Sequence, residues 1–133
     1  MAHFFILLVE DNADDRFLTT RVLRKLPVEV HIEISKNGDE ALQRILGAAA
    51  VKENLPSLIL LDLQLPKIDG IKFLGKIRER YNEKELPVIV LSSSDNPLDI
   101  VTCRELGISG YLAKPLELSV LQKHLEQCNF SSQ

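Results

Sequence analysis

Three acidic residues stand at the ends of short apolar runs in this 133-residue sequence. Glu10 and Asp11 follow the run FFILLV at 4–9, and Asp62 lies near the end of SLILLDL at 57–63. If these runs are neighbouring parallel strands, their carboxylates meet at one edge of a sheet. Two like charges roughly 4 Å apart repel by about 4 kcal/mol at an effective dielectric constant of about 20, so such a cluster needs a cation or a shifted pKa. Oxygen ligands without His or Cys suit Mg²⁺, together with phosphate oxygens and water.

Two further polar residues end apolar runs. Ser92 closes PVIVLS at 87–92, and Lys114 follows GYLA at 110–113. An ammonium group at Lys114 would offset negative charge, and the Ser92 hydroxyl is suited to donating a hydrogen bond to a phosphoryl oxygen. These residue types predict a site for phosphoryl transfer that works by positioning and charge neutralisation.

The apolar runs alternate with segments of helical periodicity. Short apolar runs bounded by turn residues predict buried strands, and strands that alternate with helices predict a parallel sheet covered on both faces. We therefore expect an α/β fold in three layers, with a doubly wound five-stranded parallel sheet in the order 2-1-3-4-5. The expected strands are 4–9, 28–34, 57–63, 87–92 and 110–113, and the expected helices are 13–26, one from 38, one from 70, 96–106 and 117–128.

Composition and charge limit the binding partners, the location and the number of domains that can be expected. Hydrophobic residues make up 45% of the chain, the formal net charge is −3 and the pI is about 5.6, so bulk charge favours neither nucleic acid nor an anionic membrane. No apolar run approaches the roughly 18 residues of a membrane span, and no signal peptide is recognised. We expect one cytoplasmic domain over 1–133, with a core at about 4–128 and no output domain. Cys103 and Cys128 are expected to be packing residues.

The sequence resembles the receiver domains of two-component response regulators. The stretches LLVEDN, LLDLQLPKIDG, PVIVLSSS and GYLAKP occur in the order and spacing of that family, and the resemblance covers about 4–128. It implies that Asp62 accepts a phosphoryl group from a sensor histidine kinase in a Mg²⁺-dependent reaction. It implies that Lys114 contacts that group and that a cis peptide bond precedes Pro115. Beyond its own phosphorylation and dephosphorylation, no enzyme activity is expected.

The resemblance also assigns the remaining roles at this site. Asp11 would ligate the metal directly, Glu10 would support it through water, and Gln64 would offer its backbone carbonyl. Ser92 would be the switch hydroxyl and Tyr111 the aromatic residue coupled to it. The pair Glu10-Asp11 replaces the family's usual Asp-Asp, and Ser92 replaces a Thr, which removes the methyl group that stiffens χ1.

A closer resemblance suggests the phosphodonor. The opening VEDNADD and the lengthened loop before the third expected strand are similar to the small regulators partnered with cyanobacterial phytochrome kinases. A phytochrome kinase is therefore one expected partner. The downstream partner is not indicated by the sequence.

An exposed apolar patch is expected on the last two helices and the strand between them. Val101 is the expected core residue of helix 96–106, and Phe17, Leu18, Val22 and Leu26 are expected to share a face of the first helix. The last helix is expected to pack through Leu118, Leu121, Leu125 and Cys128. This leaves the set Leu98, Ile100, Leu112, Leu116 and Val120 for a homodimer or another docking partner, or simply as the edge of the core.

Three other functions fit these residues less well. A phosphorylation-independent interaction module with the same fold is the main alternative, although such proteins would be expected to lose Asp62, Lys114 or an acidic residue. An aspartate-nucleophile phosphatase needs a second Asp where this chain has Gln64, and a flavin carrier needs a phosphate-binding loop where this chain has Glu-Asp-Asn.

Asp14 and Asp15 are expected to serve the helix dipole rather than a metal, and Asp69 to cap a helix.

Overall fold

The computed structural model describes residues 4–47, 50–65, 69–93 and 96–127. Strands and α-helices alternate along this part of the chain, as the apolar runs predict. The strands are β1 (Phe4–Val9), β2 (Val30–Ser35), β3 (Leu58–Asp62), β4 (Val88–Ser92) and β5 (Gly110–Ala113). The helices are α1 (Ala13–Leu23), α2 (Gly38–Leu46), α3 (Gly70–Arg78), α4 (Pro97–Leu106) and α5 (Leu118–Gln127), with a 3₁₀ turn, η1, at Lys52–Asn54.

The five strands form one parallel sheet in the order β2-β1-β3-β4-β5, which confirms the predicted topology. Val9 at the end of β1 pairs with Leu61 of β3, and Asp62 pairs with Leu91 of β4. The chain reverses its winding direction between β1 and β3. In doubly wound sheets, this switch point at the carboxyl ends of the strands is where ligands bind.

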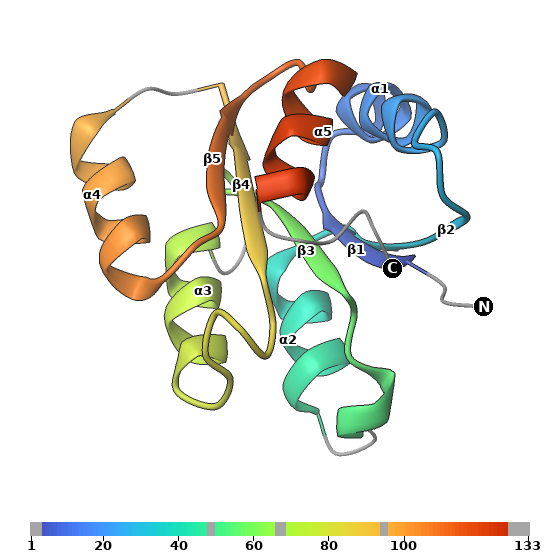
Figure 1. Cartoon of the computed structure of the whole chain (residues 1–133). Helices are drawn as coiled ribbons and strands as arrows, with labels where there is room; N and C mark the ends of the chain where they lie inside the picture. The colour runs from blue at the N-terminus through green and yellow to red at the C-terminus, as the bar shows by residue number, and fades with distance from the viewer. Residues whose placement is uncertain (1–3, 48–49, 66–68, 94–95, 128–133) are drawn as a thin grey trace.

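Helices cover both faces of the sheet and complete three layers (Figure 1). Alternate residues of each strand point to opposite faces, which creates two separate cores. Leu7 and Ile59 belong to the core shared with α2, α3 and α4, whereas Ile6 and Leu58 belong to the core shared with α1 and α5. Among the described residues, no helix is long and apolar enough to span a membrane.

Short polar side chains begin four of the helices. An Asn or Asp side chain accepts a hydrogen bond from a backbone N–H in the first turn, which satisfies a donor that the helix itself leaves unpaired. The prediction that Asp69 caps a helix is therefore confirmed. The N-capping residues are Asn12 of α1, Asn37 of α2, Asp69 of α3 and Asn96 of α4.

The inward face of α1 differs from the prediction. Phe17 and Leu18 are exposed, while Thr19 and Leu23 are buried. The helix ends at Leu23, and Leu26 is buried beyond its end. The prediction was therefore wrong for Phe17 and Leu18 but holds for Val22 and Leu26, which pack in the core shared with α5. The stripe that faces the sheet starts at a threonine, which hydrophobic periodicity does not detect.

The exposed patch expected around α4 and α5 also needs correction. Leu112 and Leu116 are buried, because α5 lies on the face of the sheet to which Leu112 points. Val101 is 52% exposed, so it is not the core residue of α4. Cys103 takes that place, and burial raises the pKa of its thiol to about 11, which fits the predicted packing role.

Two residues of the expected patch are exposed. Leu98 is 75% exposed and Val120 is also exposed, whereas Ile100 is partly buried. In α5, Leu121 and Leu125 are buried and Leu118 packs at the edge of the same core, as predicted. Cys128 lies outside the described residues.

Candidate phosphoryl-transfer site

The ends of four parallel strands deliver the predicted side chains to one edge of the sheet. Glu10 follows β1, Asp62 is the last residue of β3, Ser92 is the last residue of β4, and Lys114 follows β5. Neighbouring strands run in the same direction, so these four positions come together although they are far apart in the sequence. The predicted convergence is confirmed.

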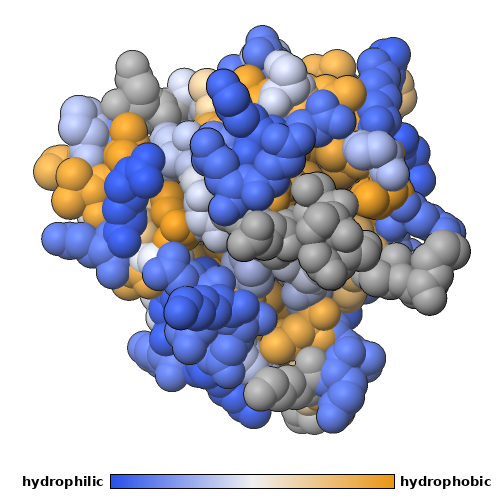
Figure 2. Space-filling view, viewed as in Figure 1, coloured by the Kyte–Doolittle hydropathy of each residue, from blue (hydrophilic) through white to orange (hydrophobic). Residues whose placement is uncertain are grey.

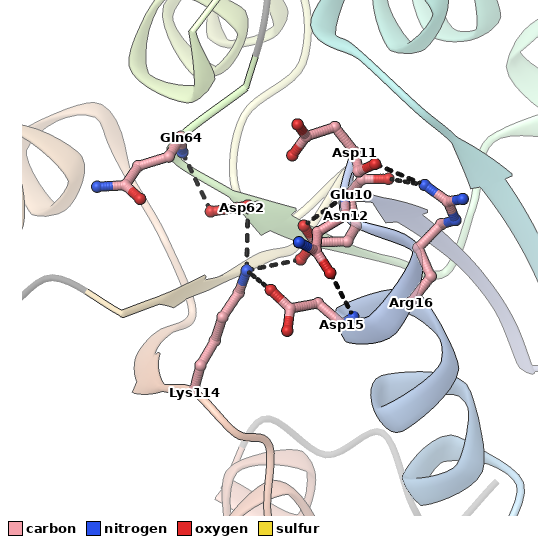
Figure 3. A network of polar contacts seen from close by, with 8 residues as sticks. All are labelled: Glu10, Asp11, Asn12, Asp15, Arg16, Asp62, Gln64 and Lys114. Carbon is pink, nitrogen blue, oxygen red and sulfur yellow. Dashed lines mark hydrogen bonds and ion pairs between the residues drawn. The ribbon is translucent and has the colours of Figure 1, made fainter.

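Lys114 is at the centre of the polar network (Figure 3). Its Nζ atom lies 2.8 Å from Glu10 Oε1, 2.9 Å from Asp15 Oδ2 and 3.1 Å from Asp62 Oδ2. An ammonium group has three donor hydrogens, which match these three carboxylates in number. The peptide bond between Lys114 and Pro115 is cis, as the resemblance implies.

The two strand-end carboxylates are buried. Glu10 is 1% exposed and Asp62 is 5% exposed. Burial raises the pKa of Glu10 to about 7, and the hydrogen bond from Lys114 offsets this only in part. Burial alone would lower the pKa of Lys114, but its hydrogen bonds to Glu10, Asp15 and Asp62 raise that pKa above its usual range. The site therefore pairs a strongly retained lysine charge with a carboxyl group that gives up its proton reluctantly.

Three carboxylates could hold a metal ion together. One oxygen each of Glu10, Asp11 and Asp62 lies within 4.8 Å of the others, and within the described ranges this is the one such group of acidic, His or Cys side chains. Asp11 is exposed, so one side of the group is open to solvent. An all-oxygen set with an open side fits Mg²⁺, which keeps several water ligands.

The backbone around Asp62 restrains its carboxylate. The Gln64 N–H donates a hydrogen bond of 3.1 Å to Asp62 Oδ1. Gly70, the first residue of α3, donates its N–H to the Leu63 carbonyl at 2.9 Å. A Cβ at Gly70 would lie 2.7 Å from the Asp62 carbonyl oxygen and 2.6 Å from Leu63 Cα, so only glycine fits against this strand end. The carbonyl of Gln64 as a metal ligand stays a prediction.

The two predicted switch residues lie on β4 and β5. Ser92 is buried and pairs with Ala113, and the Lys114 N–H donates to the Ser92 carbonyl at 3.0 Å. Tyr111 is partly buried and packs against the core shared with α2, α3 and α4. Their side chains therefore belong to adjacent strands, which is a necessary condition for coupling between them.

Three residues of α1 and the turn before it were not predicted to contribute. Asp15 pairs with Lys114, although it was expected to serve only the helix dipole. Arg16 Nη1 donates to the backbone carbonyls of Glu10 and Asp11 at 3.2 and 2.8 Å. The Asn12 N–H donates to Glu10 Oε2 at 3.2 Å, and its side chain caps α1. Their closeness in sequence to the acidic pair was the available signal.

The sequence matches known proteins along most of its length. The sequence profile described as response regulator receiver domain matches residues 6–126. Response regulator Rcp1 of Synechocystis sp. is 37% identical over 123 residues, which are 91% of this chain and 83% of that protein.

Solved structures of similar proteins have the same fold. The Mn²⁺-bound form of Rcp1 gives a TM-score of 0.78 at 33% identity and covers 97% of this chain and 96% of that chain. The phosphorylated cyanobacterial phytochrome response regulator RcpA gives a TM-score of 0.78 at 36% identity and covers 98% of this chain and 94% of that chain. The family match at 6–126 includes Glu10, Asp62, Ser92 and Lys114.

Proposed function

Because the chain belongs to the response regulator receiver domain family, we propose that it is the receiver of a cytoplasmic phosphorelay, which accepts a phosphoryl group on Asp62 from a sensor histidine kinase. The observation that carries this proposal is the contact of Lys114 Nζ with Asp62 Oδ2, at 3.1 Å, beside a group of three carboxylates that fits Mg²⁺. The Asp62 carboxylate, which would become an acyl phosphate, thus contacts the Lys114 ammonium and also belongs to the group that fits Mg²⁺.

The chain's own residues can perform the transfer by positioning and charge neutralisation. A carboxylate oxygen of Asp62 attacks phosphorus, the bond from phosphorus to the histidine nitrogen breaks, and an aspartyl phosphate forms. Lys114 neutralises charge on the phosphoryl oxygens, while Glu10 and Asp11 would hold the metal together with Asp62. Mg²⁺, when bound, supplies the positive charge that lets an anionic phosphoryl group approach anionic carboxylates.

The relatives support a narrower proposal about the phosphodonor. RcpA is a cyanobacterial phytochrome response regulator, and its structure was obtained in the phosphorylated form. Rcp1 has a Mn²⁺-bound form, which together with the group of three carboxylates in this chain supports binding of a divalent cation here. We therefore propose a histidine kinase of the phytochrome class as the donor and Mg²⁺ as the cation.

Ser92 and Tyr111 are proposed as the switch. A phosphoryl group on Asp62 would draw the Ser92 hydroxyl toward it, and Tyr111 on the neighbouring strand would occupy the vacated space. Such a side-chain rearrangement biases two packed states by differential contact. The change would reach β5, which carries Tyr111, and α4, which follows β4 in the chain.

The surface next to the switch is the proposed docking face. Leu98 and Val101 are exposed on α4, and Val120 is exposed on α5. Figure 2 shows hydrophobic surface on the side of the molecule where α4 lies. We propose that these three residues, with the partly buried Ile100, bind a second copy of the chain or a downstream protein. Phosphorylation-independent docking through the same face is the alternative.

Phosphotransfer from purified histidine kinases tests this function. The wild-type chain should take up label from a phytochrome-class kinase in Mg²⁺ and none in excess chelator, and Asp62→Asn should take up none. Ser92→Ala should be labelled but should lose the NMR shift changes in α4 and β5 that accompany phosphorylation. If those shift changes persist in Ser92→Ala, the proposed switch is wrong. If no histidine kinase labels the wild-type chain, the interaction-module alternative is favoured.

A further inference from the structure

The Asp15 carboxylate is the third acceptor on the Lys114 ammonium, and nothing in the transfer chemistry requires it. It lies 2.9 Å from Lys114 Nζ, and its side chain is 36% exposed, whereas the other two acceptors are buried. We propose that Asp15 is a positioning residue that competes with the phosphoryl group for Lys114. This inference rests on the proposed function and adds to it a residue that sets how readily the site accepts a phosphoryl group.

The start of α1 fixes Asp15 in this place. The Asn12 side chain accepts a hydrogen bond of 2.9 Å from the Asp15 N–H. Arg16, the next residue, holds the backbone carbonyls of Glu10 and Asp11. The first turn of α1 is thus tied to the loop that carries the metal-binding carboxylates. Asp15 approaches Lys114 from this turn, while Asp62 approaches it from β3 (Figure 3).

The neighbouring Asp14 shows that a position near the helix N-terminus does not explain the contact. Both acidic residues occupy the first turn of α1, where the helix dipole favours negative charge. Asp14 is exposed, and its side chain has no ion pair or hydrogen bond within the described ranges. Of these two residues, only Asp15 contacts Lys114. Comparing a substitution of Asp15 with the same substitution of Asp14 therefore separates the effect of this contact from the effect of removing a negative charge.

Competition follows from the number of donors on the ammonium. Its three hydrogens match Glu10, Asp15 and Asp62 in number, so a phosphoryl oxygen must replace or share one of these contacts. Glu10 and Asp62 belong to the group that fits Mg²⁺, and metal binding would draw their oxygens toward the ion. Asp15 lies outside that group, so metal binding would not release it, and its carboxylate would still hold the ammonium toward α1 and away from the phosphoryl oxygens.

The size of the effect follows from the exposure of Asp15. Ion pairs with a partly exposed partner are weak, so removing the Asp15 charge should strengthen binding of a phosphoryl-like anion by about two- to fivefold. Asp15→Asn keeps the size of the side chain and retains an oxygen acceptor. Asp14→Asn removes the same charge from the same turn without touching Lys114, and it should change anion binding by less than about 1.5-fold.

Two measurements test the proposal. The first is a titration of wild type, Asp15→Asn and Asp14→Asn with beryllofluoride in saturating Mg²⁺. The second is the ¹⁵N NMR signal of the Lys114 ammonium in protein without metal or anion, identified by its loss in Lys114→Arg. We expect tighter beryllofluoride binding and a shifted ammonium signal in Asp15→Asn, and neither in Asp14→Asn.

Three other outcomes would each contradict a specific part of the proposal. Equal beryllofluoride affinities in wild type and Asp15→Asn overturn the competition, and an unchanged ammonium signal overturns the contact itself. If the wild-type chain takes up label from a kinase, these failures leave the proposed function standing. If wild type binds no beryllofluoride although the ammonium signal shows the ion pair, the proposed phosphoryl site fails, and the role of Asp15 fails with it.

Discussion

The Lys114 Nζ atom lies 2.8 Å from Glu10 Oε1, so a lysine binds a carboxylate that also belongs to the group able to hold a divalent cation. The ammonium and a bound metal would therefore attract the same carboxylate. The contact is almost fully sheltered from solvent on the Glu10 side, where screening by water and salt is weak.

Replacing Lys114 should lower the stability of the metal-free protein and raise its affinity for Mg²⁺. In Lys114→Met, the buried carboxylates of Glu10 and Asp62 lose their counter-charge, so the metal-free protein should be destabilised by about 3 kcal/mol. The same change removes a competing cation, so the affinity for Mg²⁺ should rise several-fold. Denaturant unfolding and calorimetric Mg²⁺ titration measure these quantities. Lys123→Met, at an exposed position of α5, is the control, and a Mg²⁺ affinity no higher in Lys114→Met than in this control would contradict the argument.

The pKa of Glu10 predicts how stability depends on pH. Burial raises that pKa from 4.5 to about 7, so the folded protein binds this proton more tightly than the unfolded chain does. Between these two values the stability of the metal-free protein should fall as pH rises, by up to about 3 kcal/mol, and the fall should end above the folded pKa. Mg²⁺ binds the charged form, so its affinity should rise over the same range.

Thermal unfolding in chelator and in Mg²⁺, followed across this pH range, checks that prediction. Glu10→Gln should flatten the pH dependence of the metal-free protein, whereas Glu105→Gln, at an exposed position of α4, should leave it unchanged. A pH profile of Glu10→Gln that matches the wild-type profile would show that the titrating group lies elsewhere.

Two glycines of α3 should respond to alanine in opposite directions. Gly70→Ala forces a Cβ against the backbone of Asp62 and Leu63, so it should destabilise the fold by about 1–3 kcal/mol and slow phosphorylation. Gly75 has no atom within 4 Å of an added Cβ, so Gly75→Ala should stabilise the helix by about 0.5–1 kcal/mol. Urea unfolding of both variants gives the two signs, and a harmless Gly70→Ala would mean that the strand end is not held in this way.

The exposed residues of α4 predict self-association. Leu98 and Val101 lie on the outer side of the helix, so Leu98→Glu should abolish a dimer formed through this face and leave the monomer folded. Sedimentation with and without beryllofluoride should show a dimer in wild type, strengthened by the anion. Phe17→Glu, which changes an exposed apolar residue on α1, is the matched control. A wild-type chain that stays monomeric in both states would leave this face to a different partner.

The sheet and the strand-end cluster could be predicted from the sequence because both depend on local patterns. Apolar runs mark the buried parallel strands, and the polar residue at the end of each run lies at the same edge once those strands align. Glu10, Asp62, Ser92 and Lys114 were found in this way. The N-cap at Asp69 followed from side-chain chemistry at a turn.

The wrong predictions concern residues whose burial or contacts depend on how distant elements pack together and not on the local sequence pattern. Helix α4 carries apolar residues on more than one face, and its packing on the sheet selects Cys103 and turns Val101 outward. Leu112 is buried because α5 covers its side of β5, and the local sequence pattern does not indicate where α5 packs. The contact of Asp15 with Lys114 joins residues 99 positions apart, and the helix dipole explained Asp15 well enough to hide it.

The central claim is that Asp62 accepts the phosphoryl group. Intact-protein mass spectrometry after incubation with acetyl phosphate and Mg²⁺ tests it most directly, because it counts phosphoryl groups without requiring the natural kinase. Wild type and Asp39→Asn, which changes an exposed carboxylate of α2, should each gain one base-labile phosphoryl group, and Asp62→Asn should gain none. A phosphoryl group on Asp62→Asn, or an unmodified wild-type chain, would contradict the account.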